Sequence, residues 1–92
     1  MTGVHLTGQL VCGDIGEVAA VVRHLASHVA LTRAEAGCIS FCVSRTESPF
    51  VWQVDERFRD AAAFKAHQDR VASSEWGRAT AGIERRYTID GL

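Results

Sequence analysis

The sequence predicts an α+β fold of the ferredoxin-like type, with its elements in the order β-α-β-β-α-β. Four segments are rich in β-branched, aromatic or alternating apolar residues, a pattern typical of strands. Two longer segments repeat apolar residues at helical spacing, and each follows an aspartate that can cap a helix. The order of these six segments matches the split βαβ arrangement. The 92 residues suffice for one core, so we expect a single domain over residues 1–92.

The first predicted strand covers residues 4–11, where β-branched and apolar residues alternate with polar ones. The polar residues that share one face of this strand are His5, Thr7 and Gln9. If that face looks toward the helices, these side chains supply polar groups to a cleft. If it looks toward a partner subunit or water, they are structural.

The first predicted helix runs from about residue 14 to about residue 31 or slightly beyond. Asp14 followed by Glu17 resembles a capping box, in which two side chains satisfy the free amides of the first turn. Valines and a leucine then recur at helical spacing. Residues 32–36 read as a polar connection that ends at Gly37.

Two further strands form a predicted antiparallel hairpin. Residues 38–45 alternate, followed by a turn at 46–49 with the only proline of the chain and by a third strand at 50–58. The alternation predicts Ile39, Phe41 and Val43 on one face and Cys38, Ser40, Cys42 and Ser44 on the other.

The last third of the chain predicts a helix, a short extra turn and a closing strand. Asp60 caps the helix over residues 61–71. Two serines interrupt it, and Ser74 can cap a further turn that contains Trp76. A glycine then precedes the fourth strand, residues 83–89.

Four antiparallel strands leave one sheet face for the two helices. Both alternating sets of the first three strands contain apolar residues, so the opposite face is expected to be partly apolar as well. A second copy of the chain would cover that face. We therefore expect a homodimer through the sheet faces, in which two sheets form a joint α+β barrel.

Composition excludes several classes of function. The net charge is -1 and the ten basic residues are scattered, which gives no footprint for nucleic acid or for a membrane surface. No apolar run reaches the length of a membrane span, and the N-terminus lacks the pattern of a signal peptide, so we expect a cytoplasmic protein. The odd set of Cys12, Cys38 and Cys42 indicates free thiols rather than a disulfide or a metal site.

Three segments together resemble the antibiotic biosynthesis monooxygenase (ABM) family. EAGCISFCVSR, residues 35–45, is similar to the family segment E-x-G-C-x-x-y-x-v-x-R, and ERFRDAAAFKAH, residues 56–67, to E-R-W-x-x-x-x-A-l-x-x-H. SSEW, residues 73–76, stands where the family commonly has S-P-H-F. The resemblance implies a dimeric α+β barrel with a cleft between sheet and helices in each subunit.

The resemblance also implies a chemistry, since its best-known members oxidise aromatic polyketides or quinols with O2 and need neither metal nor flavin. We therefore expect a cofactor-independent monooxygenase acting on a quinol or polycyclic phenol. One alternative is a haem-binding or haem-degrading relative, but such relatives place an asparagine in the first strand and this chain has none. The others are a non-enzymatic module that binds a small aromatic molecule and an isomerase or decarboxylase acting on a small ketone.

His67 and Glu56 are the predicted catalytic residues. His67 lies on the apolar stripe of the second helix, at the family's histidine position, and a histidine can accept a proton near neutral pH. Glu56 shares a strand face with apolar residues, where a carboxylate needs a partner. It could orient His67, or it could form a salt bridge to Arg45 or Arg85.

The predicted substrate-binding residues are the aromatic side chains expected to border the cleft, together with one polar residue of the first strand. Flat apolar rings suit a planar aromatic substrate, although such rings also build ordinary cores. The set is Trp52, Phe58, Phe64, Trp76, Tyr87 and His5. His24 and His28 are four residues apart on the first helix, but without further ligands we expect surface residues and no metal.

Overall fold

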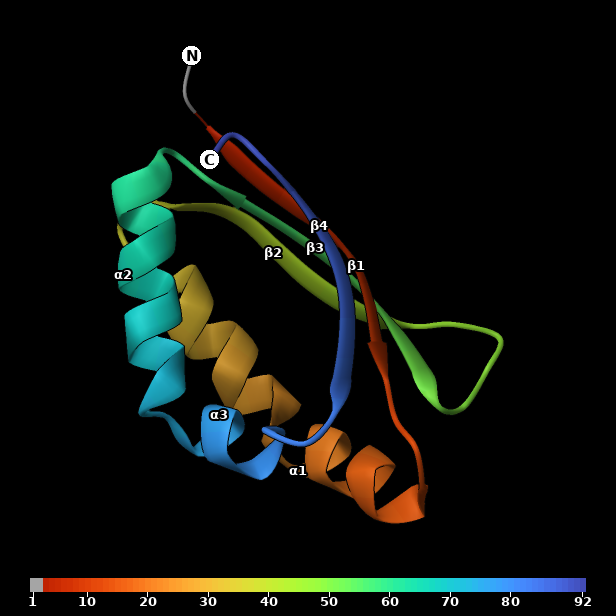
Figure 1. Ribbon diagram of the computed structural model, residues 1–92. Helices are drawn as coiled ribbons and strands as arrows, with labels where there is room; N and C mark the ends of the chain where they lie inside the picture. The colour runs from red at the N-terminus through yellow and green to blue at the C-terminus, as the bar shows by residue number, and fades with distance from the viewer. Residues whose placement is uncertain (1–2) are drawn as a thin grey trace.

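The structure, a computed structural model, describes residues 3–92. One antiparallel sheet in the order β2-β3-β1-β4 carries all helices on one face (Figure 1). The strands are β1 (Val4–Val11), β2 (Cys38–Arg45), β3 (Val51–Phe58) and β4 (Glu84–Asp90), and the helices are α1 (Ile15–Arg33), α2 (Ala61–Ala72) and α3 (Glu75–Ala79). The predicted ferredoxin-like α+β fold is confirmed. Within residues 3–92, no helix has both the length and the apolar character needed to cross a membrane.

Each helix begins at the capping residue that the sequence indicates. The Asp14 side chain accepts a hydrogen bond of 2.8 Å from the Glu17 amide, and Asp60 accepts one of 2.8 Å from Ala63. The Ser74 hydroxyl accepts one of 3.0 Å from Gly77 at the start of α3. These local contacts set where α2 ends and α3 begins, and so fix the position of Trp76 beside the sheet.

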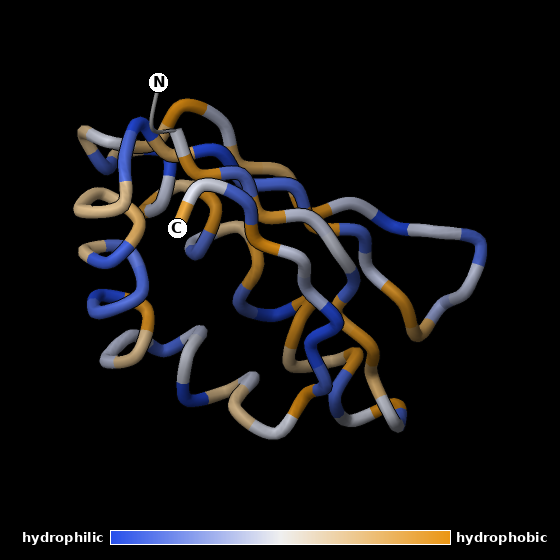
Figure 2. Tube along the Cα trace, turned by 45° about the horizontal axis from the view of Figure 1, so that its top comes forward, coloured by the Kyte–Doolittle hydropathy of each residue, from blue (hydrophilic) through white to orange (hydrophobic). Residues whose placement is uncertain are grey.

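The core lies between the helices and the inner face of the sheet. Apolar and polar residues alternate along the strands (Figure 2), and the buried members face the helices. The largest part of this core comes from β1 and β3, with contributions from each helix. Its buried residues are Val4, Leu6, Leu10, Cys12, Val21, Trp52, Val54, Phe58, Phe64, Trp76 and Ile83.

A bulge at the start of β2 changes the predicted faces of that strand. The register with β3 shifts between Cys38 and Ser40. Cys38 therefore packs against the core, whereas Ile39 is 65% exposed and Cys42 is exposed on the opposite side. The prediction that Ile39 shares a face with Phe41, and the prediction that Cys38 shares one with Cys42, are both wrong because strict alternation stops at the bulge.

The outer face of the sheet is mostly polar, and the apolar part expected of it is small, with Ile39, Val11 and Val51 among its members. The register places most apolar side chains of β1 and β3 together toward the helices and leaves mainly polar ones on the other side. The polar set on the outer face includes Thr7, Gln9, Gln53, Arg57, Arg86 and Thr88. Homodimerisation through this face stays a prediction, and polar contacts would have to supply most of its specificity.

Candidate functional site

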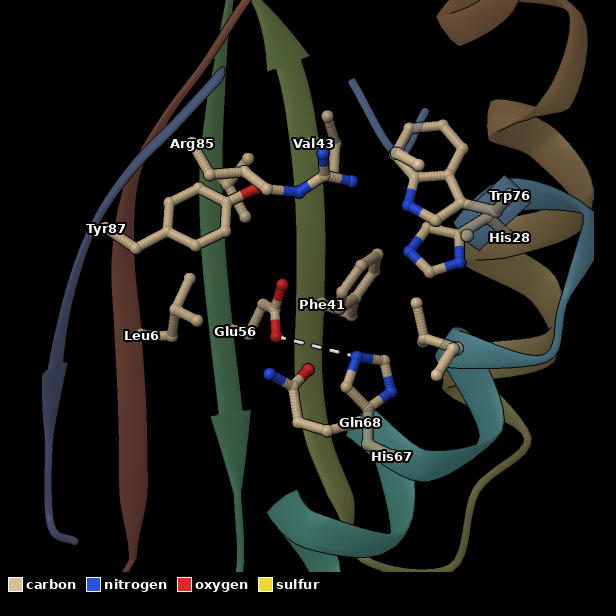
Figure 3. A pocket seen from close by; sticks show the side chains of 15 residues that line it. Leu6, His28, Phe41, Val43, Glu56, His67, Gln68, Trp76, Arg85 and Tyr87 are labelled. Atoms are coloured by element: carbon tan, nitrogen blue, oxygen red, sulfur yellow. Dashed lines mark ion pairs between the residues drawn. The ribbon is translucent and has the colours of Figure 1, made fainter. Parts of the chain in front are cut away.

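A cavity of about 390 Å³ lies between the inner face of the sheet and the helices. We call it the central cavity. All four strands contribute to one wall, and α1, α2 and α3 to the other (Figure 3). Its volume is within the range of small-molecule sites, near the lower end. Its polar lining residues are His28, Glu56, His67, Gln68, Arg85 and Tyr87.

His67 projects from α2 into this cavity and is held at one ring nitrogen. Only 3% of the residue is exposed. Its Nδ1 lies 2.9 Å from Glu35 Oε1. The other oxygen of Glu35 accepts a hydrogen bond from Arg70 Nε, and Arg70 also donates to the Thr32 hydroxyl at 3.0 Å. The α1–β2 connection and α2 thus jointly fix the plane of the imidazole ring.

The hydrogen-bond network assigns the tautomer of His67. Glu35 is paired with Arg70, so it acts as an acceptor and places the imidazole proton on Nδ1. In the neutral ring Nε2 then carries a lone pair. Nε2 lies 3.7 Å from Glu56 Oε1, which is within ion-pair range but longer than a hydrogen bond (Figure 3). The side of His67 that faces Glu56 therefore has an unused acceptor.

Burial changes the proton affinity of both groups. Desolvation raises the pKa of Glu56 to about 7, and the nearby Glu35 adds to this, while Arg85 opposes it. Burial also lowers the pKa of His67, although the adjacent Glu35 partly offsets the shift. At neutral pH the site therefore holds an uncharged imidazole next to a carboxyl group that is close to its midpoint.

Glu56 has no arginine partner. Its Oε1 is buried without a hydrogen bond, and among residues 3–92 only His67 lies within ion-pair distance of its carboxyl group. The salt bridge to Arg45 or Arg85 that the sequence left open is not formed. Glu35 rather than Glu56 makes the hydrogen bond that orients His67. Glu56 lies instead opposite the other ring nitrogen of His67, Nε2, on the side of the cavity. In this position its carboxyl group can exchange a proton with a bound molecule.

The raised pKa of Glu56 predicts that Glu56→Gln stabilises the protein at high pH. A carboxyl group whose folded pKa exceeds its unfolded value binds protons more tightly in the folded state. Its ionisation therefore reduces stability as the pH rises from about 4.5 to about 7. We expect the free energy of unfolding of the variant to exceed that of the wild type by about 3 kcal/mol at pH 8 and to equal it near pH 4.

Denaturant unfolding at several pH values measures this difference. Glu47→Gln, which removes an exposed carboxylate from the hairpin turn, is the matched control and should follow the wild type. A difference in free energy of unfolding between Glu56→Gln and wild type that stays constant across the pH range would contradict the prediction.

His28 is part of the cavity wall, which the sequence did not indicate. It is 5% exposed, and its ring stacks on Trp76 with centroids 4.4 Å apart and planes 2° apart. Its Nδ1 is buried without a hydrogen-bond partner. The expectation of a surface position is wrong for His28, because α1 continues to Arg33 and its last turns pack against α3. Within residues 3–92, no three His, Cys, Asp or Glu side chains are placed to share a metal ion.

The predicted aromatic residues divide into two groups. Trp76 and Tyr87 line the central cavity, as does Phe41, which is not among the predicted substrate-binding residues. Trp52, Phe58 and Phe64 are buried in the core and do not line it. Phe58 still supports the site from behind, since its ring lies 4.7 Å from that of His67.

His5 lies outside the central cavity. Its strand neighbours Val4 and Leu6 are buried toward the helices, so alternation places His5 on the outer face. There its Nε2 lies 3.2 Å from an Asp55 carboxylate oxygen. The expectation that His5 binds substrate with the other cavity residues is therefore corrected.

Glu35 is the functional residue that the sequence does not indicate, although it opens one of the segments that resemble the family. It lies in the stretch that the sequence predicts to be a polar connection. The signal that could have found it is Gly37, two residues later. A Cβ on Gly37 would lie 2.2 Å from Ala63 Cβ, so only glycine allows the connection to approach α2 closely enough for Glu35 to reach His67.

We expect Gly37→Ala to destabilise the protein by about 1–3 kcal/mol, because both colliding groups are close to rigid backbone. The double variant Gly37→Ala, Ala63→Gly removes the clash at the cost of a glycine in α2, about 1 kcal/mol. The double variant should therefore lose less stability than the sum of the losses of the two single variants. Thermal unfolding of the four proteins checks this, and strict additivity would contradict the steric explanation.

Solved structures with this fold come from several organisms. PA3566 from Pseudomonas aeruginosa is 27% identical, with a TM-score of 0.74 over 100% of this chain and 93% of that one. SnoaB from Streptomyces nogalater, described as a cofactor-independent oxygenase, is 12% identical, with a TM-score of 0.81 over 100% and 94%. Rv0793 from Mycobacterium tuberculosis is 19% identical, with a TM-score of 0.75 over 95% and 91%.

No curated protein sequence is significantly similar to the chain. The profile of the family described as antibiotic biosynthesis monooxygenase matches residues 13–79, which include Glu35, Glu56 and His67. That span covers most of the chain and agrees with the segments on which the sequence resemblance rests. The chain belongs to the antibiotic biosynthesis monooxygenase family.

Proposed function

We propose that this protein is a cofactor-independent monooxygenase that oxidises a quinol or polycyclic phenol with O2, with His67 as the base. The observation that carries the proposal is the arrangement of His67. Its Nδ1 is fixed by Glu35, and its Nε2 is directed toward Glu56 at the central cavity. Family membership and the fold shared with a cofactor-independent oxygenase support it.

The reaction begins with proton transfer from a substrate hydroxyl to His67 Nε2. A free phenol has a pKa of about 10, so at neutral pH only a small fraction is ionised without a base. The phenolate that forms is electron-rich enough to reduce O2. Glu35 stabilises the imidazolium through Nδ1, and its ion pair with Arg70 holds the carboxylate in place.

The substrate supplies every electron in this reaction. One oxygen atom forms a bond to a ring carbon that loses its hydrogen, and the other leaves as water with two hydrogens from the substrate. Glu56 faces the same space, and its pKa of about 7 allows it to donate a proton to the departing oxygen and to regain one. The apolar walls around Phe41 and Trp76 hold the ring.

Oxygen uptake with a panel of hydroquinones and polycyclic phenols tests this function. The expected result is one O2 consumed per substrate, with one labelled oxygen atom in the product when isotopically labelled O2 is used. Binding of these compounds without oxygen uptake would instead indicate a ligand-binding module. Product formation without O2 would indicate an isomerase or decarboxylase.

A further inference from the structure

Arg85 of β4 lines the central cavity at its edge, with part of its side chain exposed to solvent, and its guanidinium is held in place there. Its Nη1 donates to the main-chain oxygens of Thr80 at 2.7 Å and Ile83 at 2.9 Å. Its Nη2 donates to the Thr80 hydroxyl at 2.8 Å. Thr80 is fully buried at the end of α3, so the guanidinium is held by a rigid part of the fold.

Arg85 has no acidic partner. Among residues 3–92, no carboxylate lies within 4.0 Å of its guanidinium, whereas Arg70 and Arg86 are paired with Glu35 and Glu84. A guanidinium has five N–H groups, and the contacts to Thr80 and Ile83 occupy three. The Nε–H and one Nη2 hydrogen make no contact to the main chain, and the Tyr87 hydroxyl lies beside them as a hydrogen-bond partner of Arg85 (Figure 3). A carboxylate would bind here next to that hydroxyl, because its two oxygens match two N–H donors.

The central cavity thus has two polar ends. Figure 3 shows the Arg85 side chain crossing one end near Tyr87 and Val43, with Glu56 and His67 at the other. Apolar side chains, among them Leu6, Phe41 and Val54, line the same cavity. This arrangement would hold a flat molecule whose hydroxyl and anionic group stand at opposite ends of its ring system.

We propose that the substrate is an aromatic acid, with a carboxylate bound by Arg85 and the reacting hydroxyl directed to His67. The assignment of the hydroxyl to His67 depends on the proposed function, whereas the assignment of the carboxylate depends only on the position of Arg85. An arginine keeps its charge at all physiological pH values. Glu56, the acid that lines the same cavity, has a pKa raised to about 7, so at neutral pH it is only partly ionised and does not fully compensate this charge.

Calorimetric titration without O2 tests the proposal. The probes are a hydroxynaphthoate with hydroxyl and carboxylate at opposite ends of the ring system and its neutral methyl ester. The wild type should bind the acid about 10- to 100-fold more tightly than the ester, as expected of a charge-assisted hydrogen bond. Arg85→Met should lose this preference while its affinity for the ester stays unchanged.

Arg86→Met is the matched control, because it removes the same charge from the next residue on the outer face of the sheet. It should keep the wild-type preference. Thr80→Val retains the charge but removes one anchor, and should weaken the preference only in part. Circular dichroism and thermal unfolding show whether each variant is folded.

Equal affinity of the wild type for acid and ester would overturn the proposal, as would failure of both to bind or equal losses in Arg85→Met and Arg86→Met. Oxygen uptake separates this outcome from a failure of the proposed function. Turnover of neutral quinols without any preference for the acid would refute the carboxylate site but leave the monooxygenase function standing. Selective binding of the acid without any oxygen uptake would refute the monooxygenase function but leave the carboxylate site standing.

Discussion

Replacing His67 with alanine is expected to lower the turnover number for oxygen uptake by about 100-fold or more, with a smaller change in KM. The reason is that His67 Nε2 carries the lone pair that receives the substrate's proton in the proposed reaction, whereas Glu56 is assigned the proton that goes to the departing oxygen. Glu56 itself has a pKa of about 7 and stands across Nε2, where it gives protons as readily as it takes them. An oxygen electrode with any substrate turned over by the wild type measures the effect.

The pH dependence provides a second test of the same role. A base must be unprotonated, and burial lowers the pKa of His67, so the rising limb of the wild-type rate should lie below the ordinary histidine range. The rising limb should vanish in His67→Gln, which keeps a side chain of similar length. His24→Ala, a histidine on α1 that does not line the central cavity, should retain wild-type turnover. Unchanged turnover in His67→Ala would show that His67 is not the base of the reaction.

The fold was predictable because its signals are local. Asp14, Asp60 and Ser74 each cap a helix through contacts within one turn, and such contacts are readable from spacing alone. The faces of β2 were not, because a bulge depends on how the strand meets β3. Its effect appears at Ile39, an apolar side chain that the alternation places inside and the register turns outward.

The site was predictable only in part, for a related reason. His67 and Glu56 could be assigned to inward faces, and the structure brings them together from α2 and β3. Their actual partners come from segments distant in sequence. Glu35 lies in a connection with no periodicity, and its role depends on the close approach of Gly37 to α2. His28 stood at the margin of the apolar stripe, where the spacing alone did not decide between surface and interior.

His28 also determines an expected sensitivity to acid. Burial lowers its pKa to about 3, and the neighbouring His67, Arg70 and Arg85 shift it in the same direction. Across the cavity Glu56 is the titratable acid, and its protonation on acidification stabilises the fold. Between about pH 4.5 and 6.5, acidification therefore lowers the free energy of unfolding through His28 and raises it through Glu56. A variant that removes one of the two groups separates their contributions to stability.

We expect His28→Phe, which can keep the stack on Trp76, to unfold less readily than the wild type in acid. A histidine whose folded pKa is below its unfolded value contributes no penalty above the unfolded pKa of 6.5 and an increasing one as the pH falls toward 3. The gap between the variant and the wild type should therefore grow by about 3 kcal/mol from pH 7 to pH 4. Urea unfolding at each pH measures it, and His24→Phe, on the same helix, is the control. A gap that stays constant from pH 7 to pH 4 would show that His28 is readily protonated in the folded state, and that the stack on Trp76 does not keep it neutral.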